Sequence, residues 1–436
     1  MPARRRLRIR PDTAPPKWEA TVIRPRIARL IPAIGRVFHV KHIHNAVHNG
    51  GVEGLSCGQN RVANARIRLS RLVGVAVLSA LLLSGCGGIA AAAGWAAPAR
   101  MPDGSILVQV KPGEVRALDP ASGSERWHFP DSVKAEKASK RTSRPVKGTF
   151  YAAPIFDRDR IYLVSYEGHL VRIDRGQGSE ISSPWTVELG ENVVATPVLN
   201  GGRLYVATEA GDIVVVNADD GAIATRYRVE AGRIWGAPLL SGENLIISNF
   251  DQKTVYAMRL ADGKAAWSRG DVGASVAEVV PAGPNVLVGS LDGSLHALDA
   301  AGGGLRWEFK ADGWVTGAPL VAGDTIYAGT MGGSVYALTL DGQQRWQFTL
   351  DGTKPEFRAT PVLVDGTLVV VARRGVVLGL DPATGKQNWR SEIPDVRLDA
   401  SPLAAGSSVF LATTKHALIR VDAASGATQT ISAAAQ

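Results

Sequence analysis

The chain has 436 residues, of which 45% are hydrophobic and 20% are charged, a composition typical of a globular protein. Its formal net charge is +9, but residues 1–85 hold 15 basic and only 3 acidic side chains, so the remainder is slightly acidic. Because the basic excess is confined to the start of the chain, we exclude nucleic acid as a partner.

The first part of the chain has the features of a secretion signal rather than of a folded domain. Residues 1–60 show no pattern of a packed element, and we interpret them as a disordered leader or a mis-assigned start. In residues 61–85, four arginines precede an apolar run of 12 residues, 72–83. A run of this length is too short to cross a bilayer as a mature helix and has the dimensions of a signal peptide.

The apolar run ends in Leu83-Ser84-Gly85-Cys86, which resembles the lipobox of bacterial lipoproteins. The resemblance implies cleavage before Cys86 and attachment of a diacylglycerol to its sulfur. More than one acyl chain gives stable membrane anchoring. Residues 86–94 would then be a tether. The alternatives are an ordinary signal peptide or a short buried helix with a chance cysteine.

From Trp95 onward the sequence repeats about every 41 residues, in eight copies. Each copy starts at an entry proline, continues through short apolar segments separated by Gly turns, and ends in an aromatic residue. The entry prolines are Pro98, Pro154, Pro197, Pro238, Pro319, Pro361 and Pro402, and Val279 replaces the proline in the fifth copy. The terminal aromatics are Trp127, Trp185, Tyr227, Trp267, Trp307, Trp346 and Trp389, and the eighth copy lacks one.

A turn after the third segment is the sharpest mark of the repeat. In six of the eight copies an Asp or Asn stands four residues before a glycine, as in Asp119 and Gly123. The acidic or amide oxygen can accept backbone N–H groups inside the turn, and glycine supplies the positive φ. Four short strands per copy and eight copies predict an all-β, eight-bladed β-propeller over residues 95–436. We expect each terminal aromatic to pack against the next blade.

The pattern Ala117-Leu118-Asp119, Gly123 and Trp127 recurs at Ala297-Leu298-Asp299, Gly303 and Trp307. It resembles the repeat of pyrroloquinoline-quinone (PQQ) dependent dehydrogenases and of the BamB family of outer-membrane assembly lipoproteins. The resemblance covers residues 95–436 and implies a PQQ-like propeller. It specifies the fold much better than the function.

The enzyme branch of this resemblance is not supported by the residues. Quinone enzymes of this kind use a vicinal disulfide, and no cysteine follows Cys86. The histidines after Cys86 fall in four different copies without metal-ligand spacing. We therefore expect no enzyme activity, no cofactor and no metal.

Three functional interpretations stay open. The first is a lipid-anchored, extracytoplasmic scaffold like BamB, monomeric by itself, with protein partners in the cell envelope. It would sit on the outer membrane, or on the outer face of the cytoplasmic membrane in a cell without one. The second is a ligand-binding surface lipoprotein of a single-membrane bacterium. The third, least supported by the sequence, is a PQQ-dependent dehydrogenase.

The residues around each entry proline should line the central channel. The position three residues before it is large or charged in several copies, at Trp95, Tyr151, Trp235, Arg358 and Asp399. The position directly before it is small everywhere except at Glu278. These residues are our candidate ligand contacts, with an aromatic wall and an Arg358–Asp399 ion pair. The alternative is plain filling of the channel with a structural salt bridge.

A basic insertion, residues 131–148, separates the first two copies. Its cations are Lys134, Lys137, Lys140, Arg141, Arg144 and Lys147. Blade topology places it on the same face as the turns between second and third strands. Those turns carry Arg373 and Arg374 in the seventh copy and Glu167, Glu209, Asp251 and Asp292 in copies two to five. We expect a basic arc that meets an acidic partner or anionic lipid headgroups, and the alternative is a solvated loop without a partner.

Overall fold

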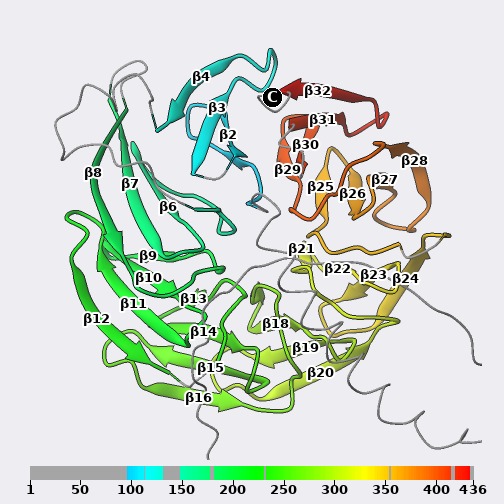
Figure 1. Ribbon diagram of the computed structural model, residues 1–436. Helices are drawn as coiled ribbons and strands as arrows, with labels where there is room; N and C mark the ends of the chain where they lie inside the picture. The colour runs from blue at the N-terminus through cyan, green and yellow to red at the C-terminus, as the bar shows by residue number, and fades with distance from the viewer. Residues whose placement is uncertain are drawn as a thin grey trace, which may run out of the picture. The chain divides into compact units, whose positions relative to one another are not determined.

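The computed structural model describes residues 96–111, 113–130, 148–176, 181–229, 232–352, 355–413 and 418–432. These residues form eight sheets of four antiparallel strands, and every sheet takes its strands from one contiguous stretch of chain. The sheets are arranged in a ring like the blades of a propeller (Figure 1). The predicted eight-bladed fold is therefore confirmed. Among the described residues, no helix has the length and apolar character needed to cross a membrane.

The strands of each blade follow one another in chain order. Blades 1 to 4 consist of β1 (Ala99–Arg100), β2 (Ile106–Lys111), β3 (Glu114–Leu118), β4 (Glu125–Phe129); β5 (Ile155–Asp157), β6 (Arg160–Val164), β7 (His169–Arg175), β8 (Ile181–Glu188); β9 (Val198–Asn200), β10 (Arg203–Ala207), β11 (Asp212–Asn217), β12 (Ile223–Arg228); and β13 (Leu239–Ser241), β14 (Asn244–Asn249), β15 (Thr254–Arg259), β16 (Ala265–Arg269). Blades 5 to 8 consist of β17 (Val280–Ala282), β18 (Asn285–Gly289), β19 (Ser294–Asp299), β20 (Leu305–Lys310); β21 (Leu320–Ala322), β22 (Thr325–Gly329), β23 (Ser334–Thr339), β24 (Gln344–Thr349); β25 (Val362–Val364), β26 (Thr367–Ala372), β27 (Val376–Leu380), β28 (Gln387–Glu392); and β29 (Leu403–Ala405), β30 (Ser408–Ala412), β31 (Leu418–Asp422), β32 (Thr428–Ser432).

Burial changes from the middle strands of a blade to its outer strand. In blade 3, β11 is buried from Asp212 to Val216, whereas β12 alternates between exposed and half-buried residues. Neighbouring blades cover both faces of the middle strands, which explains their continuous apolar runs. The outer strand has solvent on one side, so only its alternate residues pack inward.

A separate hydrophobic core lies between each pair of neighbouring blades in the described part of the chain. Between blades 3 and 4, for example, Tyr205 and Tyr256 belong to one cluster. Blades 8 and 1 are joined in the same way, with Phe410 packed in a cluster with Ile106 and Val108. The ring is thus closed by side-chain packing between blades 8 and 1, with β1 next to β29.

The terminal aromatic residues make the expected contact with the following blade. The Nε1–H of Trp267 in blade 4 donates to the carbonyl oxygen of Ala300 in blade 5, at 3.2 Å. Gly303 lies directly against the same indole ring: a Cβ atom there would stand 2.4 Å from the Cε3 atom of Trp267. Its φ is +71°. This glycine is therefore required both by backbone conformation and by the indole it contacts.

The contact between a turn glycine and the preceding blade's aromatic ring recurs around the ring. The other pairs are Gly221 with Trp185, Gly263 with Tyr227, Gly342 with Trp307, Gly385 with Trp346 and Gly426 with Trp389. The eighth blade has no terminal aromatic residue. There Ile431 takes the place of the indole and lies against Gly123 of blade 1.

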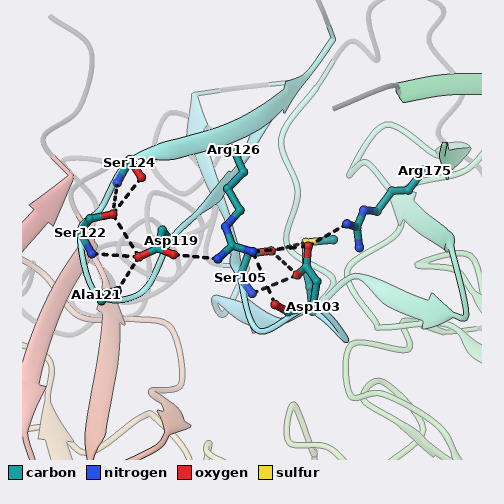
Figure 2. Close-up of polar contacts among 9 residues, drawn as sticks. Asp103, Ser105, Asp119, Ala121, Ser122, Ser124, Arg126 and Arg175 are labelled. Carbon is teal, nitrogen blue, oxygen red and sulfur yellow. Dashed lines mark hydrogen bonds and ion pairs between the residues drawn. The ribbon is translucent and has the colours of Figure 1, made fainter. Parts of the chain in front are cut away.

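Asp119 caps its own turn, as expected, and a further carboxylate, that of Asp103, links two blades (Figure 2). Asp119 accepts the N–H groups of Ala121 and Ser122, both at 3.0 Å. Asp103, in the turn between β1 and β2, accepts a 2.7 Å hydrogen bond from Arg175 at the end of β7. These contacts belong to turn structure and to the junction of blades 1 and 2.

Candidate functional site

A cavity of about 530 Å³ lies where the entry segments of all eight blades converge. In every blade whose entry segment lies wholly within the described residues, two positions contribute to the cavity wall. They are the residue three positions before the entry proline, or before Val279 in blade 5, and the residue directly before it. Blade 3, for example, contributes Val194 and Thr196, and blade 8 contributes Asp399 and Ser401. The segments are held together from blade to blade: the N–H of Thr360 donates to Oγ of Ser401 at 3.1 Å.

The structure places five of the channel candidates in the wall of this one cavity. They are Tyr151, Trp235, Glu278, Arg358 and Asp399. The sixth, Trp95, lies outside the described residues, as do the lipidation candidate Cys86 and the basic residues from Lys134 to Lys147.

Aromatic side chains form one side of the cavity. Tyr151 and Tyr166 meet edge to face, with ring centroids 5.5 Å apart. Trp235 donates from Nε1 to Oε1 of Glu209 at 2.6 Å, and the hydroxyl of Tyr166 donates to Oε2 of Glu209 at 3.1 Å. Glu209 therefore fixes the orientation of two rings in the wall. Burial raises the pKa of Tyr166, and the charge of Glu209 raises it further.

Several wall residues were not predicted to line the channel, although Glu209 was expected on the acidic arc. Tyr166, Glu209, Leu291 and Met331 come from turns between second and third strands, and Trp314 comes from the connection between blades 5 and 6. Trp314 is 46% exposed, a high value for so large an apolar side chain. The register of the entry prolines carries no information on these loops. The only signal was an aromatic residue in a loop that otherwise favours small or polar residues.

Glu278 is the acidic group that stands out in the cavity. Its side chain is open to the cavity, yet surrounding protein displaces much of its water, and this desolvation raises its pKa. Within the described part of the chain it has no hydrogen-bond or ion-pair partner. A carboxylate held in this way favours a positively charged neighbour.

Arginines and acids form a network on the side of the cavity made by blades 7 and 8. Arg373 joins Glu356 at 3.0 Å to Asp399 at 2.8 Å. Arg358 pairs with Glu356 at 3.1 Å, and Arg397 pairs with Asp399 at 3.2 Å. Burial, and then the nearby charge of Arg373, lower the pKa of Arg358.

This network corrects the expected pairing of Arg358 with Asp399. Arg373 lies in the turn between β26 and β27. It forms the ion pair with Asp399 that was expected for Arg358. The candidate surface cation Arg373 is therefore half-buried and paired, whereas its neighbour Arg374 is exposed. Sequence position alone gave both residues the same role.

The turns between second and third strands and the connections between blades share one face of the ring. The N–H of Tyr166 donates to the carbonyl of Thr149 at 2.7 Å, and the N–H of Met331 donates to that of Trp314 at 2.9 Å. Two carboxylates of the expected acidic arc have partners within this face: Glu209 binds Trp235, and Asp251 binds Arg233. Glu167 is exposed there. In the described residues, no group of three or more potential metal ligands occurs.

These observations define a class of protein: an eight-bladed propeller whose Asp–Gly turns lie against the indole of the preceding blade, with a channel that differs from blade to blade. The family model described as "Outer membrane protein assembly factor BamB" matches residues 90–191, 182–281 and 252–435. The chain belongs to this family.

Individual relatives are distant. The chain is 23% identical to BamB of Yersinia pestis over 241 residues, which cover 49% of this chain and 61% of the relative. It is 26% identical to BamB of Moranella endobia (strain PCIT) over 256 residues, 53% of this chain and 65% of the relative. The matched region is therefore less than two thirds of either relative.

The crystal structure of BamB from Moraxella catarrhalis has a similar fold. It superposes with a TM-score of 0.59 at 17% sequence identity and covers 74% of this chain and 93% of that one. At this level of identity the superposition supports the fold and not a shared set of contacts.

Proposed function

We propose that the protein is a non-enzymatic scaffold that is lipid-anchored outside the cytoplasm and takes part in envelope protein assembly. The observation that carries this proposal is the family match, which extends from residue 90 to residue 435 and so spans every blade of the ring. The relatives named above are described as outer membrane protein assembly factors. We extend that role to this chain as a proposal.

The residues of the chain support a scaffold more than an enzyme. No cysteine follows Cys86, so a vicinal disulfide of the kind found in quinone enzymes has no residues to form it. The repeated aspartates, which are the most numerous candidate acids, serve as turn caps: Asp381 accepts N–H groups from Ala383 and Thr384. Binding of a partner is a function that the exposed turns and connections of a propeller can perform without further machinery.

We propose that the anchor is a lipid on Cys86, that residues 86–94 are a tether, and that 95–436 are the propeller. The partner would contact the face that carries Arg374. It would also contact the basic insertion, which lies outside the described residues and holds Lys134, Lys137, Lys140, Arg141, Arg144 and Lys147. Arg373 would support this face through its ion pairs instead of touching the partner. The partner surface would be acidic, because opposite charges favour encounter and register.

The experiment is crosslinking of the natural protein in its own membranes, followed by pull-down and identification of the crosslinked species. The test variant reverses three charges of the insertion, Lys140→Glu, Arg141→Glu and Arg144→Glu. The matched control reverses three exposed cations near turns of the opposite face, Arg203→Glu, Lys264→Glu and Lys386→Glu. We expect the partner to be lost only in the test variant. Equal capture by both variants would remove the basic face from the proposal.

The anchor is tested separately by metabolic labelling with palmitate. The wild-type chain should take up label, and Cys86→Ser should not. Absence of label from the wild-type chain would refute lipidation while leaving the scaffold role to the crosslinking experiment.

A further inference from the structure

The central cavity is asymmetric in charge. Near blades 2 to 6 its wall holds the rings of Tyr151, Tyr166, Trp235 and Trp314 together with the carboxylates of Glu209 and Glu278. Near blades 7 and 8 its arginine, Arg358, is already bound to Glu356. The side with aromatic rings is therefore negative, whereas on the opposite side three arginines pair with two carboxylates and leave one positive charge in excess.

Glu278 departs from the repeat in a way that ring packing does not require. In every other described blade the residue before the entry proline is Ala, Thr or Ser, and only blade 5 has a charged residue there. Blade 5 has also lost the proline itself, which is Val279. The Glu278 side chain is exposed to the cavity and has no hydrogen-bond or ion-pair partner among the described residues. A charged side chain that the repeat does not require, and that faces the cavity without a partner, points to a ligand.

The surrounding rings favour a cation over any other polar ligand. The face of an aromatic ring is negative and attracts ammonium and guanidinium groups. Trp235 already makes such a contact within the protein: the guanidinium carbon of Arg233 lies 4.7 Å from the ring centroids of both Trp235 and Phe250. An anionic ligand would instead approach Glu209 and Glu278.

We propose that the central cavity binds an organic cation, with Glu278 as its ion-pair partner and exposed aromatic rings such as Trp314 as its stacking surface. The cation is an ammonium or guanidinium group, supplied either by a basic side chain of a peptide or by a free polyamine. The proposal rests on the cavity alone and does not depend on lipidation or on the basic face.

The test is isothermal titration calorimetry on the purified propeller-containing chain with three probes. Spermidine represents a free polyamine. A short acetylated and amidated peptide with one arginine represents a basic side chain. The same peptide with citrulline in place of arginine keeps the shape and removes the charge. The variants are Glu278→Gln and, as a matched control, Glu243→Gln, an exposed acid in the turn between β13 and β14.

We expect saturable binding of spermidine or of the arginine peptide, and the probe that saturates identifies the source of the cation. Glu278→Gln should weaken that binding by about tenfold or more, since hydrogen bonds to charged groups are worth roughly 1.5–3 kcal/mol. Glu243→Gln should leave it unchanged. If Glu278→Gln does not fold by circular dichroism, Trp314→Leu replaces it, and it should also weaken binding.

Three results would overturn the proposal. The first is absence of saturable binding of both cationic probes to the wild-type chain. The second is saturable binding of the arginine peptide that the citrulline peptide matches in affinity. The third is an affinity that neither Glu278→Gln nor Trp314→Leu changes. None of these results would affect the crosslinking outcome, so the two proposals can fail independently.

Discussion

The outer rim and the central channel of this propeller obey different rules. At the rim, one contact repeats: a turn glycine lies against the aromatic ring of the preceding blade. In the channel, the position three residues before the proline is Tyr in blade 2, Val in blade 3, Trp in blade 4 and Arg in blade 7. A repeated residue satisfies a repeated packing demand, whereas residues that differ from blade to blade reflect something that the ring itself does not need.

The sharpest way to break this comparison is at a rim glycine. Gly303→Ala would place a methyl group 2.4 Å from the Trp267 ring at a φ of +71°. We expect the free energy of unfolding to fall by about 2–4 kcal/mol, from backbone strain and from displacement of the indole. Gly304→Ala is the control, since open space surrounds it, and it should change stability by less than about 0.5 kcal/mol. Urea denaturation measures both, and equal effects would refute the packing role.

The next test compares two tryptophans with the same substitution. Trp307→Phe removes the 2.9 Å hydrogen bond from its Nε1–H to the carbonyl of Leu340 and part of the contact with Gly342. It should cost about 1–2 kcal/mol. Trp314→Phe in the channel should cost less than about 0.5 kcal/mol. A larger loss at Trp314 would mean that the channel is packed for stability like the rim.

A smaller effect is expected from the ion pair that joins blades 1 and 2. Burial raises the pKa of Asp103, but hydrogen bonds from Ser105 and the charges of Arg175 and Arg126 outweigh it, so the net shift is downward. Asp103→Asn should therefore destabilise the protein above the ordinary aspartate pKa by less than about 1 kcal/mol. The difference from wild type should vanish as the pH falls through the lowered pKa.

A double-mutant cycle with Arg175→Gln checks the origin of that effect. Non-additive losses of stability at pH 7 would show that Asp103 and Arg175 interact across the blade junction. Additive losses would assign the effect of Asp103 to its own turn.

The smallest effect, and one of opposite sign, is predicted in the channel. Because the pKa of Glu278 is raised in the folded protein, its ionisation disfavours folding as the pH rises through the unfolded and then the folded pKa. Glu278→Gln should therefore stabilise the ligand-free protein at pH 7, by less than about 1 kcal/mol because cavity water screens the charge. At pH below the unfolded glutamate pKa the gain should disappear. Thermal denaturation at both pH values measures it, and destabilisation at pH 7 would mean that Glu278 has a stabilising partner within the protein.

The blades could be predicted from the sequence because their packing demands recur at a fixed spacing. Asp, Gly and Trp mark each turn and outer strand, and the entry proline sets the register that places Tyr151 and Arg358 in one wall. The turn glycines are required by their positive φ and also by their contact with an aromatic ring. The contact could not be predicted from one copy of the repeat, because the ring belongs to the preceding blade. The same holds for Ile431, whose side chain contacts Gly123 of blade 1 where the other blades have an aromatic ring.

The channel was predictable only where it follows the repeat. Trp314 lies in a connection whose path depends on neighbouring turns, so sequence spacing did not place it. Glu209 lies in the turn where it was expected, but its bond to Trp235 of the next blade could not be predicted. Arg373 and Arg374 are adjacent and have the same charge, yet one bonds Asp399 and the other faces solvent. Pairing of side chains between blades depends on the closed ring and cannot be derived from either segment alone.

The junction of blades 8 and 1 has a practical consequence. Each blade is one continuous segment, and no strand crosses from one sheet into another. In Figure 1 the cyan and red blades adjoin without exchanging a strand. A circularly permuted chain, in which a linker joins β32 to β1 and the backbone is cut between two other blades, would therefore retain every hydrogen-bonded sheet. The order in which the blades are synthesised is thus separable from the architecture that they build.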